Sequence, residues 1–121
     1  MTDIHIDHDS AVPPYEQVRM RIADLAATGA LAAGAKLPPV RQLATDLGLA
    51  ANTVARAYRE LEQAGLVETR GRLGTIITAR AARVPIEAQN AATRYAQQSR
   101  SLGIPAQTAL DLVRAALQLP G

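Results

Sequence analysis

The chain has 121 residues, a length that suits one domain, and although its formal net charge is only +2, residues 36–83 carry eight basic and four acidic residues. The lack of cysteine excludes disulfides and thiolate metal sites, and no run of about 18 apolar residues is present that could form a transmembrane helix. We therefore expect a cytoplasmic protein without a membrane partner, whose small core of Leu, Val, Ile and three tyrosines favours self-association.

The first part of the chain predicts a strand and two helices. Residues 4–7, "IHID", alternate apolar and polar side chains and predict a short edge strand. Residues 13–29 open with proline, end with glycine and carry apolar residues at helical spacing, so they predict a helix. The same signals predict a second helix over residues 38–48, and an alanine-rich and glycine-containing connector separates the two.

A third helix and a hairpin follow. Residues 49–65 predict a helix that ends at a glycine, with Gly48 forming the turn before it. Residues 66–70 and 75–79 are short β-branched runs on either side of "GRLG", which is typical of a two-stranded hairpin. Helix, turn, helix and hairpin in this order outline a winged helix-turn-helix, in which the second helix of the motif enters the DNA major groove.

The remaining chain predicts two more helices, over residues 86–103 and 104–118. The predicted fold class is therefore mainly α with a small β-wing, with a DNA-binding domain over residues 1–79 and a helical dimerisation region over residues 80–121. Two amphipathic helices are too few to bury their own apolar faces, so we expect them to pair with a second copy. The predicted dimer-interface residues are Ala91, Tyr95, Leu102, Leu110, Val113 and Leu117.

The third predicted helix has a polar outer face. Asn52, Arg56, Arg59 and Gln63 lie opposite the apolar side, with Thr53 at the edge. Arginines and amides bond bidentately to base edges, and the basic middle of the chain suits a polyanion such as DNA. A solvated helix face or a merely charged surface would produce the same pattern, so its weight depends on the neighbouring segments.

Those segments supply further cations. Arg41 stands near the start of the second helix, and Arg70 and Arg72 flank the hairpin turn. We expect these three side chains to bind mainly phosphate or the groove edge, because they surround the third helix. Asn52, Thr53 and Arg56 are expected to contact bases, because they occupy the half of that helix which enters the groove first. The predicted partner is double-stranded DNA.

Three stretches together resemble a known family: "PPYEQV", "GAKLPPVRQLATDLGL" and "NTVARAYRELEQAGLVETRGRLGT". They resemble the N-terminal DNA-binding domain of the GntR family of bacterial transcription regulators, and the short tail resembles the YtrA-like subgroup. The resemblance implies a dimeric regulator, most often a repressor, that binds a near-palindromic operator. It also implies DNA contacts from Arg41, Thr53, Gly74 and Thr75.

The sequence departs from the family at three alanines. Ala50 stands where many members have a serine or asparagine N-cap, and Ala51 and Ala55 stand where many have arginine. The resemblance then implies that the usual arginine contact is absent or has passed to Arg56 and Asn52. The first glycine of the hairpin turn is also shifted by one place relative to the family pattern.

Other functions receive less support. His5 and His8 lie among aspartates near the start, but these side chains alternate along the chain and nothing else converges on them, which disfavours a metal site. No nucleotide-binding glycine motif or catalytic grouping is present, so we expect neither an enzyme nor a cofactor.

Three questions stay open at the level of sequence. The winged domain could be a protein-interaction module without an operator, which the outward arginines disfavour. The chain could be a piece of a longer fusion with an aminotransferase-like domain, which is disfavoured because the tail predicts helices and ends at "LPG". A small-molecule effector could exist, and the small tail would place it between subunits or domains.

Overall fold

The computed structural model describes residues 4–120 of the chain. It forms two compact units, Met1–Ile86 and Glu87–Gly121, which are described separately below. The domain boundary predicted after Ala79 comes just before a 3₁₀ turn, η2 (Ala81–Arg83), which belongs to the first unit. Among the described residues, no helix has both the length and the hydropathy that a membrane crossing needs.

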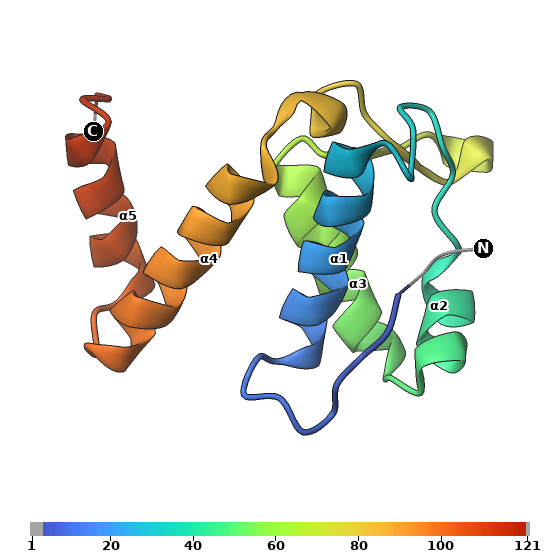
Figure 1. Ribbon diagram of the computed structural model, residues 1–121, viewed down its shortest axis with the longest axis horizontal. Coiled ribbons are helices and arrows are strands. Elements are labelled where there is room, and N and C mark those ends of the chain that lie inside the picture. Colours follow the sequence, from blue (N-terminus) through green and yellow to red (C-terminus); the bar gives the residue numbers. More distant parts are fainter. Residues whose placement is uncertain (1–3, 121) are drawn as a thin grey trace. The chain divides into compact units, whose positions relative to one another are not determined.

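Three helices form the body of the first unit, as the sequence predicts: α1 (Pro14–Thr28), α2 (Val40–Leu47) and α3 (Ala51–Gln63). In Figure 1, α1 and α3 lie side by side, and α3 packs extensively against both α1 and α2. Gly29 and Gly48 end α1 and α2 with φ of 85° and 67°, a left-handed backbone that only glycine adopts without strain.

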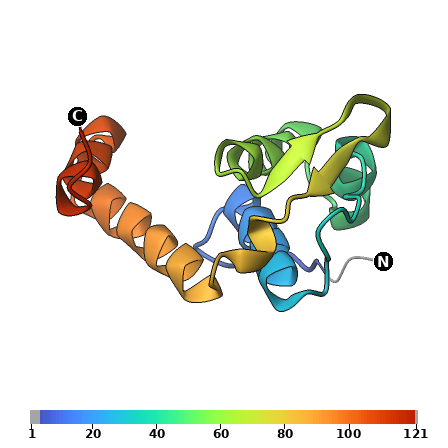
Figure 2. The same ribbon diagram turned by 90° about the horizontal axis from the view of Figure 1, so that it is seen from above.

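The predicted wing is present as an antiparallel hairpin of β1 (Val67–Thr69) and β2 (Thr75–Ile77). Its two strands and projecting turn are seen from above in Figure 2. The 3₁₀ turn η1 (Gly71–Leu73) connects the strands, and Arg70 and Gly74 close it through a 2.8 Å backbone hydrogen bond. The mainly helical fold with a small β-wing is therefore confirmed.

The connector between α1 and α2 has more structure than the sequence predicts. Its backbone pairs with the outer edge of β2, with Lys36 opposite Ile76 in an isolated antiparallel bridge. The amide of Leu37 donates to the carbonyl of Thr75 at 2.8 Å, and Gly34 donates to Ile77 at the same distance. Both edges of β2 are thus hydrogen-bonded, which fixes the wing to the chain that enters α2.

One hydrophobic core unites all parts of the first unit. It takes side chains from the three helices, the wing and η2, and its largest fully buried members are Ile22, Leu43, Leu61, Ile77, Val18, Val54 and Val67. The apolar faces of the three helices supply most of these residues. Because the core contains no aromatic ring except Tyr58, close packing of branched aliphatic side chains holds α3 in place.

The strand predicted over residues 4–7 is absent, and this expectation was wrong. Ile4 is buried and Ile6 packs against the core, so the alternation correctly marks the apolar side chains. The backbone of Asp7, however, exchanges hydrogen bonds of 2.8 and 2.9 Å with the side-chain amide of Gln17 on α1. A side chain therefore satisfies the backbone polar groups of Asp7, which a neighbouring strand would otherwise bind.

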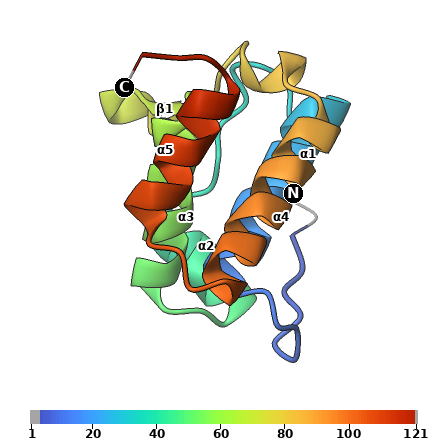
Figure 3. The ribbon, with the colours of Figure 1, turned by 90° about the vertical axis from the view of Figure 1, so that its left-hand side faces the viewer.

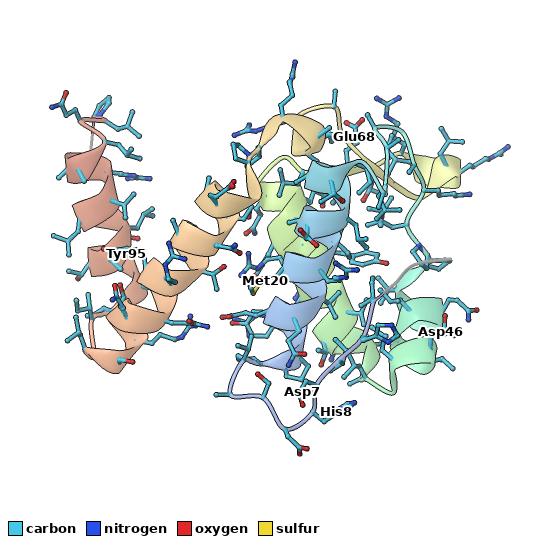
Figure 4. The ribbon with its side chains drawn as sticks, viewed as in Figure 1. Asp7, His8, Met20, Asp46, Glu68 and Tyr95 are labelled. Atoms are coloured by element: carbon cyan, nitrogen blue, oxygen red, sulfur yellow. The ribbon has the colours of Figure 1, made fainter. Side chains whose placement is uncertain are left out.

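The second unit is a helical hairpin of α4 (Ile86–Ser101) and α5 (Ala106–Ala116), joined by a short turn (Figure 3). Gly103 lies in that turn with φ of 72°, as the sequence predicts for a helix end. The Tyr95 hydroxyl on α4 donates a 2.8 Å hydrogen bond to the Ala109 carbonyl on α5. Figure 4 labels Tyr95 between these two helices.

Candidate nucleic-acid interface

The start of α3 is set by a tight turn after α2. The amide of Leu49 donates to the carbonyl of Ala44 at 2.9 Å, which closes the turn around Gly48. Ala50 then takes the N-cap position with φ of −67° and ψ of 145°, and no side chain caps the helix. The exposed amide donors at this end of α3 are therefore available to water or to an anion.

The outer face of α3 is polar and open. Asn52, Arg59 and Gln63 are exposed and Thr53 is half-buried. The apolar residues on the opposite side of the helix are all buried: Val54, Ala57, Tyr58 and Leu61. Within residues 4–120, Arg59 has no ion pair. Amide and guanidinium groups on this face present the donors and acceptors that base edges in a major groove can bind.

Arg56 lies differently from the other polar residues of α3. Its guanidinium carbon lies 3.7 Å from the centroid of the Tyr15 ring on α1, and its Nε donates to Glu60 Oε2 at 3.2 Å. The other oxygen of Glu60 lies 3.2 Å from Nε of Arg19, close enough for an ion pair but not aligned for a hydrogen bond. The side chain predicted to contact bases is thus directed toward α1.

The Tyr15 ring belongs to a charged environment. Its hydroxyl lies 3.3 Å from Oε1 of the buried Glu16. Burial, reinforced by the negative charge of Glu16, raises the pKa of Tyr15, while the Arg56 guanidinium opposes this shift. The phenol is therefore neutral, and its ring face interacts favourably with the cation beside it.

Cations surround α3 on α2 and on the wing. Arg41 is exposed in the first turn of α2, and Arg72 is exposed in the turn between the strands; within residues 4–120 neither has an ion pair. Arg70 instead binds Glu68 of the same wing at 2.6 Å, and Figure 4 labels Glu68 there. The predicted wing residues Gly74, just before β2, and Thr75, its first residue, are half-buried.

Lys36 joins this group, although it was not among the residues predicted from the sequence. Its pairing with Ile76 places it beside the wing, and a Cβ added at Gly74 would meet the Lys36 Cε at 3.5 Å. The only available signal was a single lysine in an alanine- and glycine-rich connector. Because its neighbour arrives from a distant part of the sequence, local patterns could not place it.

The predicted interface residues of the second unit have mixed exposure. Tyr95 and Val113 are half-buried, and Ala91 is exposed. Five large apolar side chains in this unit are also exposed: Leu102, Leu110, Leu112, Leu117 and Leu119. Leu112 and Leu119 were not among the predicted interface residues. The hairpin of α4 and α5 therefore presents an apolar surface without a partner inside the unit.

His5 and His8, considered above as possible metal ligands, are both exposed. Figure 4 labels His8 and Asp7 in the loop that precedes α1. In the part of the chain that the structure describes, no three His, Asp or Glu side chains come together as a metal site would require.

Comparison with known proteins agrees with this geometry. The model of the family "Bacterial regulatory proteins, gntR family" matches residues 14–77, which span α1 to β2. The HTH-type transcriptional regulator Rv1152 of Mycobacterium tuberculosis is 45% identical over 117 residues, covering 97% of this chain and 93% of that protein. The HTH-type transcriptional repressor YtrA of Bacillus subtilis is 45% identical over 85 residues, covering 69% of this chain and 65% of that protein.

A solved structure extends the similarity to three dimensions. YtrA from Sulfolobus acidocaldarius, described as a GntR-family transcription factor, superimposes with a TM-score of 0.61 at 29% identity. The match covers 79% of this chain and 97% of the other.

Proposed function

The chain belongs to the GntR family of bacterial regulatory proteins, and we propose that it represses transcription in the cytoplasm by binding a near-palindromic operator as a homodimer. The protein is a transcriptional regulator rather than an enzyme. The observation that carries the proposal is the open polar face of α3, with unpaired cations on α2 and on the wing.

In the proposed complex, α3 lies in the major groove. Its N-terminal half brings Asn52 and Thr53 to base edges, with Arg56 as a further base contact and Arg59 on the same outer face. Residues on α2 and the wing fix the position of the protein on the duplex through phosphate or groove-edge contacts. These residues are Arg41, Arg70, Arg72, Gly74 and Thr75.

Dimerisation is proposed through the second unit. Exposed leucines on α5 and in the segments just after α4 and α5 are costly in water, and a second copy of the same hairpin would cover them. Two-fold symmetry would then place two α3 helices on half-sites about one helical turn apart, which is why the operator is proposed to be near-palindromic. Repression is supported by the name of the related protein from B. subtilis, a transcriptional repressor.

Selection of bound duplexes from a random pool tests the proposal directly. The full chain is incubated with random duplex DNA at a fixed salt concentration, and bound DNA is amplified and sequenced over several rounds. We expect one enriched motif with inverted half-sites, bound far more tightly than a shuffled duplex between about 50 and 200 mM salt. Equal binding of all sequences, or none at low salt, would favour the protein-interaction module instead.

A further inference from the structure

Arg56 is the one cation of α3 that two other side chains of the protein hold in place. The Tyr15 ring covers one face of its guanidinium, with the carbon 3.7 Å from the ring centroid. Glu60, one turn further along α3, accepts a hydrogen bond from its Nε at 3.2 Å. The side chain is nevertheless 53% exposed, so a DNA ligand could reach it.

These two contacts compete with DNA for the same guanidinium. A helical ion pair and an exposed cation–π contact together favour the held arginine side chain over the free one by roughly threefold to tenfold. A single solvent-exposed phosphate contact is of similar strength and would not reliably displace Arg56. A bidentate contact to a guanine edge discriminates by roughly 5-fold to 150-fold, a range that mostly exceeds the hold on Arg56, so such a contact can displace it.

We propose that Glu60 is a specificity-determining residue, which withholds Arg56 from the phosphates of arbitrary DNA and releases it only to a matching base edge. The inference rests on the proposed function, because it concerns how the same surface distinguishes an operator from other DNA. Glu60 also repels phosphate itself, since its carboxylate is 31% exposed on the same helix.

A purely structural role is the competing explanation. Glu60 also pairs with Arg19 of α1, whose side chain is only 18% exposed, so it could simply join two helices. A structural role predicts lower stability for a Glu60 variant and equal effects on all DNA. If Glu60 withholds Arg56, a Glu60 variant should instead gain affinity selectively for non-matching DNA, and this gain should require Arg56.

Glu60→Gln is the central variant, and Glu62→Gln is its matched control. Glu62 is exposed on the same helix and has no ion pair among residues 4–120, so both changes remove one negative charge from α3. Affinities for the selected duplex and for a shuffled duplex are measured by fluorescence anisotropy across a salt series. Thermal unfolding of each variant shows that it is folded.

Relative to Glu62→Gln, we expect Glu60→Gln to bind the shuffled duplex roughly threefold to tenfold more tightly at low salt. Its salt dependence should steepen by about one phosphate contact. The selected duplex should gain less, so the ratio of the two affinities falls. In an Arg56→Ala background, Glu60→Gln and Glu62→Gln should have equal effects.

The Tyr15 ring gives a second, independent test. Tyr15→Leu removes the aromatic face and should also raise binding to the shuffled duplex, whereas Tyr15→Phe keeps the face and should leave it unchanged. This pair remains informative if Glu60→Gln unfolds, because neither variant alters the ion pair between Glu60 and Arg19.

Two outcomes would overturn this inference and leave the proposed function intact. One is equal behaviour of Glu60→Gln and Glu62→Gln on a wild-type background. The other is a gain for Glu60→Gln that persists without Arg56, which would point to Arg19 or to net charge. If the wild-type chain fails to prefer any selected duplex, the proposed function itself fails, and this inference fails with it.

Discussion

The hydroxyl of Tyr58 on α3 donates a 2.7 Å hydrogen bond to the backbone carbonyl of Pro38, just before α2. The ring is buried in the core, so this bond satisfies a polar group that water reaches poorly. It connects α3 to the entry of α2, and thereby helps to fix the angle at which the polar face of α3 is presented.

Tyr58→Phe should lower the free energy of unfolding by about 1–3 kcal/mol, because the Pro38 carbonyl loses its partner in a place that water reaches poorly. Urea unfolding followed by circular dichroism measures the change. Tyr15→Phe is the control and should cost less, since its hydroxyl makes only a 3.3 Å contact to Glu16. Equal costs for both variants would show that the Pro38 contact is not special.

Alkaline pH should destabilise the fold through the same hydroxyl. Burial raises the pKa of Tyr58, so the folded state retains a proton that the unfolded chain releases near pH 10. Stability from this group is complete below about pH 10 and falls above it, by up to about 1.4 kcal/mol per pH unit. Urea unfolding between about pH 8 and 11 should show a shallower decline in Tyr58→Phe than in the wild type.

Ala50→Ser should stabilise the first unit by about 0.5–2 kcal/mol, because a serine hydroxyl can accept from the free amides that begin α3. Ala50 already has extended N-cap geometry and no side-chain cap. The melting temperature of Ala50→Ser is compared with that of Ala51→Ser, which places the hydroxyl inside the helix and should not stabilise. A melting temperature that does not rise for Ala50→Ser would contradict this reading of the helix start.

Arg41→Ala and Asn52→Ala should separate positioning on DNA from base recognition. Loss of Arg41 should weaken all duplexes alike and lower the salt slope by about one, with the selected motif unchanged. Loss of Asn52 should cost about 1–3 kcal/mol on the selected duplex only and relax one base position. Anisotropy titrations at several salt concentrations measure both. An unchanged motif after Asn52→Ala would point to shape recognition instead.

Leu110→Glu and Leu117→Glu should convert the proposed dimer into a monomer at micromolar concentration, because a charge on α5 or just after it would have to be buried in the interface. Sedimentation velocity measures the mass directly. Leu73→Glu is the control, since this leucine is also exposed but lies in the wing. A wild-type chain that sediments as a monomer would remove the basis for two-fold operator recognition.

Local signals were sufficient to predict most of the first unit. Gly29 and Gly48 end helices because their backbones are left-handed, and the inward residues of α3 follow the helical repeat. The "IHID" expectation failed because alternation tells which side chains are buried, not whether a strand lies alongside to accept the backbone hydrogen bonds. Gln17 takes that role, and no pattern within residues 4–7 indicates it.

The sequence allowed us to predict which residues form most of the candidate interface, but not which side chains they contact. The outward position of Arg56 follows from helical spacing, but its contact with Tyr15 depends on how α1 packs against α3. The pairing of Arg70 with Glu68, by contrast, is local to the hairpin, because the two residues are close neighbours in sequence. Lys36 was missed because its position beside the wing depends on a backbone pairing between distant segments.

We expect that pairing of the connector with β2 also to set the order of folding events. The bond between the Arg70 amide and the Gly74 carbonyl closes within the hairpin and can form early, from a short loop. The 2.9 Å bond from the Ile77 amide to the Ala35 carbonyl joins segments separated by α2 and α3, so it forms only after those helices have docked. In hydrogen exchange, the Ile77 amide therefore reports the opening of the whole unit, whereas the Arg70 amide reports local fraying of the hairpin.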